Sequence, residues 1–250
     1  MIVSLLAFLT VFTAIVLVHE FGHFIAARKT GIRVYEFSIG FPFSPRLFTL
    51  FRHKETAFTV RVLPLGGFVS FSQDGDEEAA DLFKASRNKR ALVLSAGSLF
   101  NIIFAFIVFV PVFAIGKHLN LIDAILLSAN TVWSILSGSI MLFVNILTGH
   151  GAMDGLSGPV GIAAMAGQAA SKGILSLFYF TGALSMSLGI MNLLPLPALD
   201  GGHLIMLFIE SIRKKPLSPK TYQVATLAGL SLFLVLTLAV TYKDVAKLIA

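Results

Sequence analysis

The chain has 250 residues, of which 56% are hydrophobic and only 13% are charged. A single soluble domain of this size could not bury so much apolar surface, so we expect a membrane protein. The absence of cysteine excludes disulfides and thiolate metal ligands, which leaves His, Asp and Glu to hold any metal. The net charge of +6 fits the accumulation of Lys and Arg on the cytoplasmic side of a membrane, and we expect no nucleic-acid partner.

Four segments are long and apolar enough to cross a bilayer, which takes about 20 residues. They are residues 1–27, 91–115, 174–194 and 222–242. The first could be a signal peptide, but Met1 to Leu6 contains no basic residue, so we expect a retained span.

A fifth segment, residues 121–147, is long enough to span but carries Asp123 and several Asn, Ser and Gly residues. Eleven of the 19 Lys and Arg residues lie between the first two spans, and four more lie in residues 213–220. If both stretches are cytoplasmic, an even number of crossings separates them. We therefore predict that residues 121–147 form an amphipathic helix on the outer surface, and that the N-terminus lies outside.

Residues 32–72 change character. Short runs alternate in polarity, as in residues 57–63, and Pro and Gly interrupt them, which predicts strands and turns. The many phenylalanines indicate a β-rich element that dips into the inner leaflet, although an ordinary cytoplasmic hairpin remains the alternative. The acidic residues between Asp74 and Asp81 predict a solvated connecting loop.

The first span ends in His19-Glu20-Phe21-Gly22-His23, an HExxH pattern. Residues four apart lie on one face of a helix, so His19 and His23 can bind one ion while Glu20 reaches its water. A charged carboxylate at bilayer depth is costly and usually functional. The alternative is that the motif merely lies at the membrane interface, where polar groups cost little.

A hydrolytic zinc site typically has three protein ligands and keeps one position for water. Asp200 is the best third ligand, because the predicted topology brings the ends of the first and third spans to the same leaflet. Pro195 and Pro197 break the helix before it, as is typical of membrane sites. The Asn192 amide could stabilise an oxyanion or simply bond a neighbouring helix. We regard His203 as a helix-surface residue and Glu210 as a poorer ligand.

These motifs resemble the site-2 protease family of intramembrane zinc metalloproteases. Its signatures are HExxH at residues 19–23 and the NxxPxPxLDG pattern at residues 192–201. Residues 63–69, 96–101 and 157–163 look like the bacterial branch typified by the sigma-E-regulating protease. The resemblance covers nearly the whole chain and implies a multi-pass protein of the bacterial inner membrane, with its active site near the cytoplasmic leaflet.

The resemblance implies that His19, His23 and Asp200 bind one Zn²⁺ per chain, that Glu20 is the general base and that Asn192 assists. It also implies that the β-rich element guides an extended substrate, the predicted partner being a single-span membrane protein or peptide within the bilayer. We assign substrate contacts to Phe58, Thr59, Val60, Arg61, Val62, Gly66, Gly67, Pro195 and Pro197, with residues 58–63 or 68–72 as an edge strand. Relatives of this branch usually carry PDZ domains, and we expect none here.

The fold prediction is therefore a mainly helical membrane protein forming one metalloprotease domain over residues 1–250, with four spans, a β-rich element and an outer surface helix. Its predicted function is endopeptidase cleavage within or near transmembrane segments, in regulated intramembrane proteolysis or remnant signal-peptide clearance. Two other classes remain: a metal or proton transporter, or an inactive scaffold. A transporter often has internal repeats, and a structural zinc site has four protein ligands. The sequence favours neither.

Overall fold

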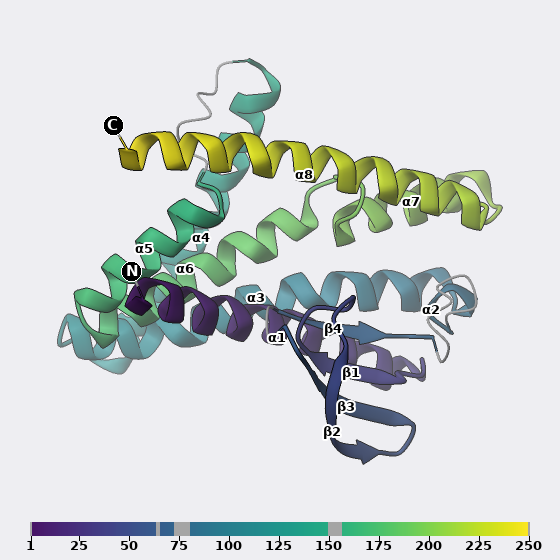
Figure 1. Ribbon diagram of the computed structural model, residues 1–250, viewed down its shortest axis with the longest axis horizontal. Helices are drawn as coiled ribbons and strands as arrows, with labels where there is room; N and C mark the ends of the chain where they lie inside the picture. The colour runs from purple at the N-terminus through teal and green to yellow at the C-terminus, as the bar shows by residue number, and fades with distance from the viewer. Residues whose placement is uncertain (1, 64–65, 73–80, 150–156, 250) are drawn as a thin grey trace. The chain divides into compact units, whose positions relative to one another are not determined.

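The computed structural model describes residues 2–63, 66–72, 81–149 and 157–249, so most of the predicted acidic loop lies outside the described residues. The elements follow one another as a long first helix, a group of strands and a series of helices (Figure 1). In chain order they are α1 (Ile2–Thr30), β1 (Glu36–Ile39), β2 (Arg46–His53), β3 (Thr56–Arg61), β4 (Gly67–Ser70), α2 (Asp81–Lys84), α3 (Arg87–Gly116), α4 (Leu121–Leu147), α5 (Pro159–Ser171), α6 (Ile174–Leu193), α7 (Asp200–Arg213) and α8 (Pro219–Ile249).

Five of these helices are long and apolar enough to cross a membrane: α1, α3, α4, α6 and α8. Four of them contain the predicted spans. The fifth, α4, has the lowest mean hydropathy of the five, 1.5, but qualifies by length and composition. The chain is therefore a mainly helical, multi-pass membrane protein, and the surface position of α4 stays a prediction.

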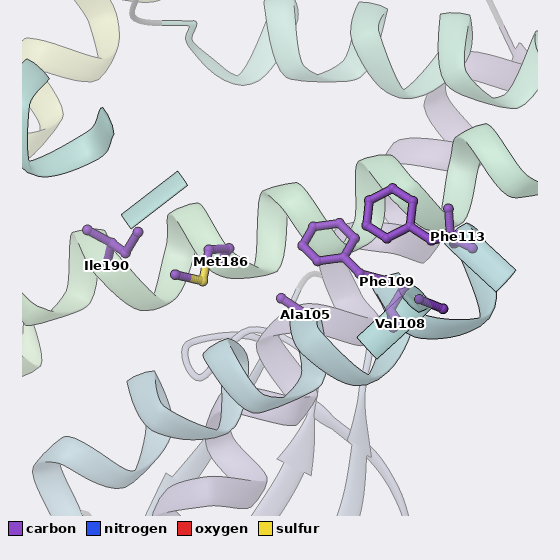
Figure 2. Packing of buried hydrophobic residues seen from close by; sticks show 8 residues of the cluster. Ala105, Val108, Phe109, Phe113, Met186 and Ile190 are labelled. Carbon is purple, nitrogen blue, oxygen red and sulfur yellow. The ribbon is translucent and has the colours of Figure 1, made fainter. Parts of the chain in front are cut away.

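The chain divides into two compact units. The bundle unit comprises residues 1–11, 102–190 and 230–250, and the site unit comprises residues 12–101 and 191–229. The core of the bundle unit is apolar: Figure 2 shows Ala105, Val108, Phe109 and Phe113 of α3 with Met186 and Ile190 of α6. The rings of Phe109 and Phe113 stack 5.9 Å apart.

One polar contact fastens two helices of the bundle unit. The Asp244 carboxylate, buried near the end of α8, accepts hydrogen bonds from the backbone N–H groups of Gly158 and Gly161, at 2.8 and 2.9 Å. These groups lie at the start of α5, where backbone donors lack helical partners and attract negative charge. Asp244 thus caps α5 from a distant part of the sequence.

The site unit contains one small sheet with strand order β2-β3-β1-β4. Strand β3 pairs with β2 on one side, antiparallel, and with β1 on the other, parallel. Our prediction that residues 58–63 form an edge strand is therefore wrong, because β3 already has both neighbours. Among the described strands, β2 and β4 form the two edges of the sheet. The alternative prediction, an edge strand at residues 68–72, agrees with the structure over Phe68 to Ser70, which belong to β4.

Candidate metal centre

His19 and His23 stand one turn apart on α1, and both are buried. Their Nε2 atoms are 3.1 Å apart. Asp200 Oδ2, at the start of α7, lies 3.1 Å from the Nε2 of His19 and 3.3 Å from that of His23. The structure thus brings together the three residues that the sequence predicts as ligands, with all their ligand atoms within 4.8 Å.

The mutual spacing of these atoms fits a tetrahedral zinc ion. With metal–ligand bonds of about 2.0–2.1 Å, two ligand atoms of a tetrahedron lie about 3.3 Å apart, close to the observed separations. Asp200 Oδ2 and His19 Nδ1 are buried atoms that find no hydrogen-bond partner within the described part of the chain. A cluster of converging lone pairs is unfavourable without a cation, so the donor set fits a metal.

His23 is oriented by α3. Its Nδ1 lies 2.8 Å from the carbonyl oxygen of Val93, and donation of the Nδ1 proton leaves the Nε2 lone pair directed at the other ligands. The two helices approach closely because both lack a side chain where they cross. A Cβ at Gly22 would lie 2.5 Å from the carbonyl oxygen of Ala96, and one at Gly97 would lie 2.5 Å from His23 Nε2.

Asp200 is placed by an irregular segment between α6 and α7. Helix α6 ends at Leu193, the two prolines follow, and Ala198 adopts a left-handed φ of 76° just before α7 begins. Gly202 lies so close to this segment that a Cβ would overlap the carbonyl of Leu196. Burial alone would raise the pKa of the Asp200 carboxyl, but the adjacent imidazoles of His19 and His23 hold the pKa below its ordinary value. A lowered carboxyl pKa is compatible with a metal ligand, which has to be deprotonated.

Glu20 lies beside the edge strand β4. A Cβ on Gly67 would come within 3.7 Å of Glu20 Cγ, and the backbone of Val69 interacts with the Glu20 carboxylate. Gly66 and Ser70 direct their carbonyls at the backbone N–H groups of Gly40 and Tyr35. Backbone N–H and C=O groups of successive residues point to opposite sides of a strand. The backbone groups of Gly67 and Val69 therefore point away from β1, toward the outer edge of β4. The outer edge of β4, which no other described strand covers, thus lies next to Glu20.

Three other predicted substrate residues make contacts within the sheet. Thr59 is buried, and its hydroxyl lies 2.6 Å from Glu36 Oε1. Arg61 forms an ion pair with the same carboxylate, at 3.0 Å. Both side chains therefore hold the sheet together. Phe58 stacks on Phe51 of β2 at 4.4 Å.

Val60 pairs with Ile39 and with Phe48, inside the sheet, whereas Val62 is exposed just after β3. Asn192 is half-buried in the last turn of α6, and Pro195 and Pro197 lie in the segment that leads to Asp200. Their roles stay predictions.

Sequence reasoning missed a buried network of polar side chains that joins α7 to α3 and α8. Glu210, which we regarded only as a poor ligand, is 1% exposed and pairs with Arg90 of α3 at 3.1 Å. His203 is half-buried and stacks on Tyr222 of α8, and it lines a cavity of about 530 Å³ beside these residues. Residues 120 positions apart carry no spacing signal. The one available clue was an acidic residue within an otherwise apolar run of α7.

A family model for Peptidase family M50 matches residues 7–236. A zinc metalloprotease of Clostridium perfringens is 28% identical, over 95% of this chain and 97% of that protein. Zinc metalloprotease RasP of Shouchella clausii is 25% identical, over 98% of this chain and 99% of that protein. Regulator of sigma-W protease RasP of Bacillus subtilis is 48% identical over 103 residues, which are 41% of this chain and 24% of that protein.

The aligned regions of the first two relatives comprise 327 and 417 positions, more than the 250 residues of this chain, so both relatives carry residues that it lacks. The match itself extends from the helix of the HExxH motif, through the Asp200 segment, into α8. The chain belongs to Peptidase family M50, the site-2 protease family, and is an intramembrane zinc metalloprotease.

Proposed function

We propose that this protein cleaves single-span membrane proteins or peptides within or near their transmembrane segments, with one Zn²⁺ per chain held by His19, His23 and Asp200. The observation that carries the proposal is the convergence of three candidate ligand atoms at 3.1–3.3 Å, close enough to the Glu20 carboxylate to interact with it electrostatically. A hydrolytic site of this kind uses three protein ligands and one open position.

In the proposed reaction, Glu20 is the general base. Its carboxylate accepts a proton from the attacking water and then delivers that proton to the leaving amide nitrogen. When bound, zinc polarises the scissile carbonyl and acidifies the water. The Asn192 side-chain amide donates to the substrate carbonyl oxygen as negative charge develops there.

We assign the binding of extended substrate to the edge of β4. A helical substrate keeps its carbonyls in intrahelical hydrogen bonds, so it must unwind before attack. The outward backbone groups of Gly67 and the outward carbonyl of Val69 can pair with an added strand, while the Val69 N–H lies at the Glu20 carboxylate. Substrate held there lies next to the base. Val62, Gly66, Pro195 and Pro197 border this path in our proposal, whereas Thr59 and Arg61 act by supporting the sheet.

The site also supports a topology of four spans with α4 on the outer surface. His23 at the end of α1, Val93 near the start of α3 and Asp200 after α6 meet at one site. This supports an even number of crossings between the start of α3 and the end of α6. With α3 and α6 crossing and α5 only 13 residues long, a full crossing by α4 would make the number odd.

The distribution of charge supports the orientation. The basic residues gather before α3 and after α7, which favours a site near the cytoplasmic leaflet and an N-terminus outside. We further propose that the chain is one protease domain without a PDZ domain. The extra residues in the two longer relatives are consistent with this, and so is the α3–α4 connection, since α3 ends at Gly116 and α4 begins at Leu121.

The first test compares the purified protein with its Glu20→Gln variant, measuring zinc content and cleavage of a single-span substrate in detergent. We expect the variant to keep about one zinc per chain and to lose cleavage, because Gln cannot carry the proton. A His19→Ala control should lose zinc as well. Equal cleavage by Glu20→Gln and the parent would overturn the role of Glu20. Zinc transport into sealed vesicles without cleavage would favour the transporter.

A second test addresses the substrate edge. Val69→Pro removes the outward backbone N–H of β4, which contacts Glu20 and borders the proposed substrate path, so we expect cleavage to fall strongly while zinc content stays unchanged. Leu50→Pro, on the other edge strand β2, is the matched control, because edge strands tolerate proline. If both variants cleave like the parent, substrate does not pair with β4. If only Leu50→Pro is impaired, β2 is the substrate edge.

A further inference from the structure

The buried network of Arg90, Glu210 and Tyr222 connects three helices of the site unit. Arg90 donates to Glu210 Oε2 at 3.1 Å and to the Tyr222 hydroxyl at 2.9 Å. The Tyr222 hydroxyl donates to Glu210 Oε1, also at 3.1 Å. The backbone N–H of Leu217, in the connection between α7 and α8, donates to the same oxygen at 3.0 Å. Every oxygen of the carboxylate is thus engaged.

Such a network is an expensive way to stabilise a fold. The side chains of Arg90 and Glu210 are only 7% and 2% exposed. Removing two charges from water costs so much that apolar residues of similar volume often stabilise a protein as well or better. Hydrogen bonds have preferred directions, whereas apolar packing does not. The network can therefore fix the rotation of the three helices and their positions along their axes.

Each of the three helices also contacts or carries residues that place the candidate metal ligands. On α3, Val93 lies one turn after Arg90 and its carbonyl orients His23, while Gly97 leaves room for both imidazoles. Helix α7 begins at Asp200 and reaches Glu210 after ten residues, about 15 Å along its axis. Helix α8 lies close to the segment before Asp200, as Gly229 shows: a Cβ at this position would overlap the carbonyl of Pro197.

We propose that Arg90, Glu210 and Tyr222 are positioning residues for the metal centre. By locking α7 to α3 and α8, they set the distance between the Asp200 carboxylate and the two imidazoles. The inference rests on the proposed assignment of His19, His23 and Asp200 as zinc ligands. A shift or rotation of α7 would carry Asp200 with it, because the helix is continuous between the two positions.

The experiment separates positioning from simple stabilisation. The double variant Arg90→Met/Glu210→Met replaces the ion pair by apolar side chains of similar length, and Tyr222→Phe removes only a hydroxyl. Lys84→Met is the matched control, since Lys84 lines the same cavity but its side chain is 65% exposed. For each full-length protein in detergent we would measure the thermal midpoint without metal, the zinc affinity by competition with a chelator, and the visible spectrum with Co²⁺.

We expect the double variant to unfold at or above the parent temperature, yet to bind zinc about tenfold more weakly, as supporting residues of metal sites do. Its Co²⁺ spectrum should also change, because the ligand geometry changes. Tyr222→Phe should show a smaller loss in the same direction, and Lys84→Met should match the parent in all three measurements. Parent-like zinc affinity and spectrum in a folded double variant would overturn the proposal.

If the double variant fails to fold, Tyr222→Phe decides the question: an unchanged zinc affinity and an unchanged Co²⁺ spectrum would overturn the positioning role. A failure of the underlying assignment has a different signature. In that case the parent itself would bind no zinc, or His19→Ala would bind zinc as tightly as the parent does.

Discussion

The bundle unit and the site unit use close packing for different ends. In the bundle unit, Phe109 fills the space that Gly182 leaves, so a small residue meets a large apolar ring. In the site unit, Gly97 makes room for the imidazoles of His19 and His23, so a small residue meets metal ligands. Gly182 affects only how well the apolar core of the bundle unit is filled. Gly97 determines whether the three candidate ligand atoms can converge.

The largest effect should come from Gly97→Ala. A Cβ there would lie 2.5 Å from His23 Nε2 and 2.7 Å from His19 Cε1, so the imidazoles must move apart. We expect weaker zinc binding and a loss of cleavage of about a hundredfold, the upper end of the effect seen when a metal-orienting group is removed. Zinc content and cleavage rate test this, with Gly138→Ala as control, because a Cβ at Gly138 meets nothing within 4 Å. Full zinc binding by Gly97→Ala would mean that the helix crossing is looser than described.

The second prediction concerns the corresponding glycine of the bundle unit. In Gly182→Ala the new Cβ would lie 2.7 Å from the Phe109 ring. We expect a loss of about 1–3 kcal/mol in the free energy of unfolding, as is typical of overpacked cores. Unfolding in increasing SDS measures this loss, while zinc content stays at the parent level. A loss of zinc without a loss of stability would contradict the contrast between the two units.

The third prediction tests the polar contact of the bundle unit. Asp244→Asn keeps the shape of the side chain but removes the charge that faces the start of α5. We expect a loss of about 0.5–2 kcal/mol, the range for helix caps and charges at helix ends. The SDS midpoint should fall, with the zinc affinity unchanged. An effect confined to zinc binding would assign Asp244 to the site instead.

The smallest effect should come from the sheet. Burial raises the pKa of Glu36, but hydrogen bonds from Thr59 and Arg61 and the charges of Arg61 and Arg46 outweigh it, so the pKa lies below its ordinary value. Glu36 therefore stabilises the sheet at neutral pH, and this contribution is lost as the pH falls through the lowered pKa. Glu36→Gln should be less stable than the parent at pH 7, and the difference should shrink in acid. A constant difference across this range would rule out the charge as its cause.

The helices and the convergence of the three candidate ligands were the parts most readily predicted from sequence. Long apolar runs mark α1, α3, α6 and α8, and the spacing of His19 and His23 requires only helical geometry. Asp200 could be chosen because the predicted topology places the ends of the first and third spans at the same leaflet. Strand order was harder, since alternation in residues 57–63 shows a strand without showing its neighbours, and β3 proved internal. The Arg90–Glu210 pair depends on tertiary contacts alone.

The shortness of β4 has a consequence for selectivity. The strand has four residues, and only Gly67 and Val69 face outward, so an added chain gains few main-chain bonds. If substrate pairs with β4 as we propose, so few bonds cannot hold a segment that strongly prefers its helical form. Selectivity among substrates would then depend on how easily the substrate helix unwinds. Two substrates with the same side chains at the scissile bond would be cleaved at different rates if their neighbouring turns differ in helix propensity.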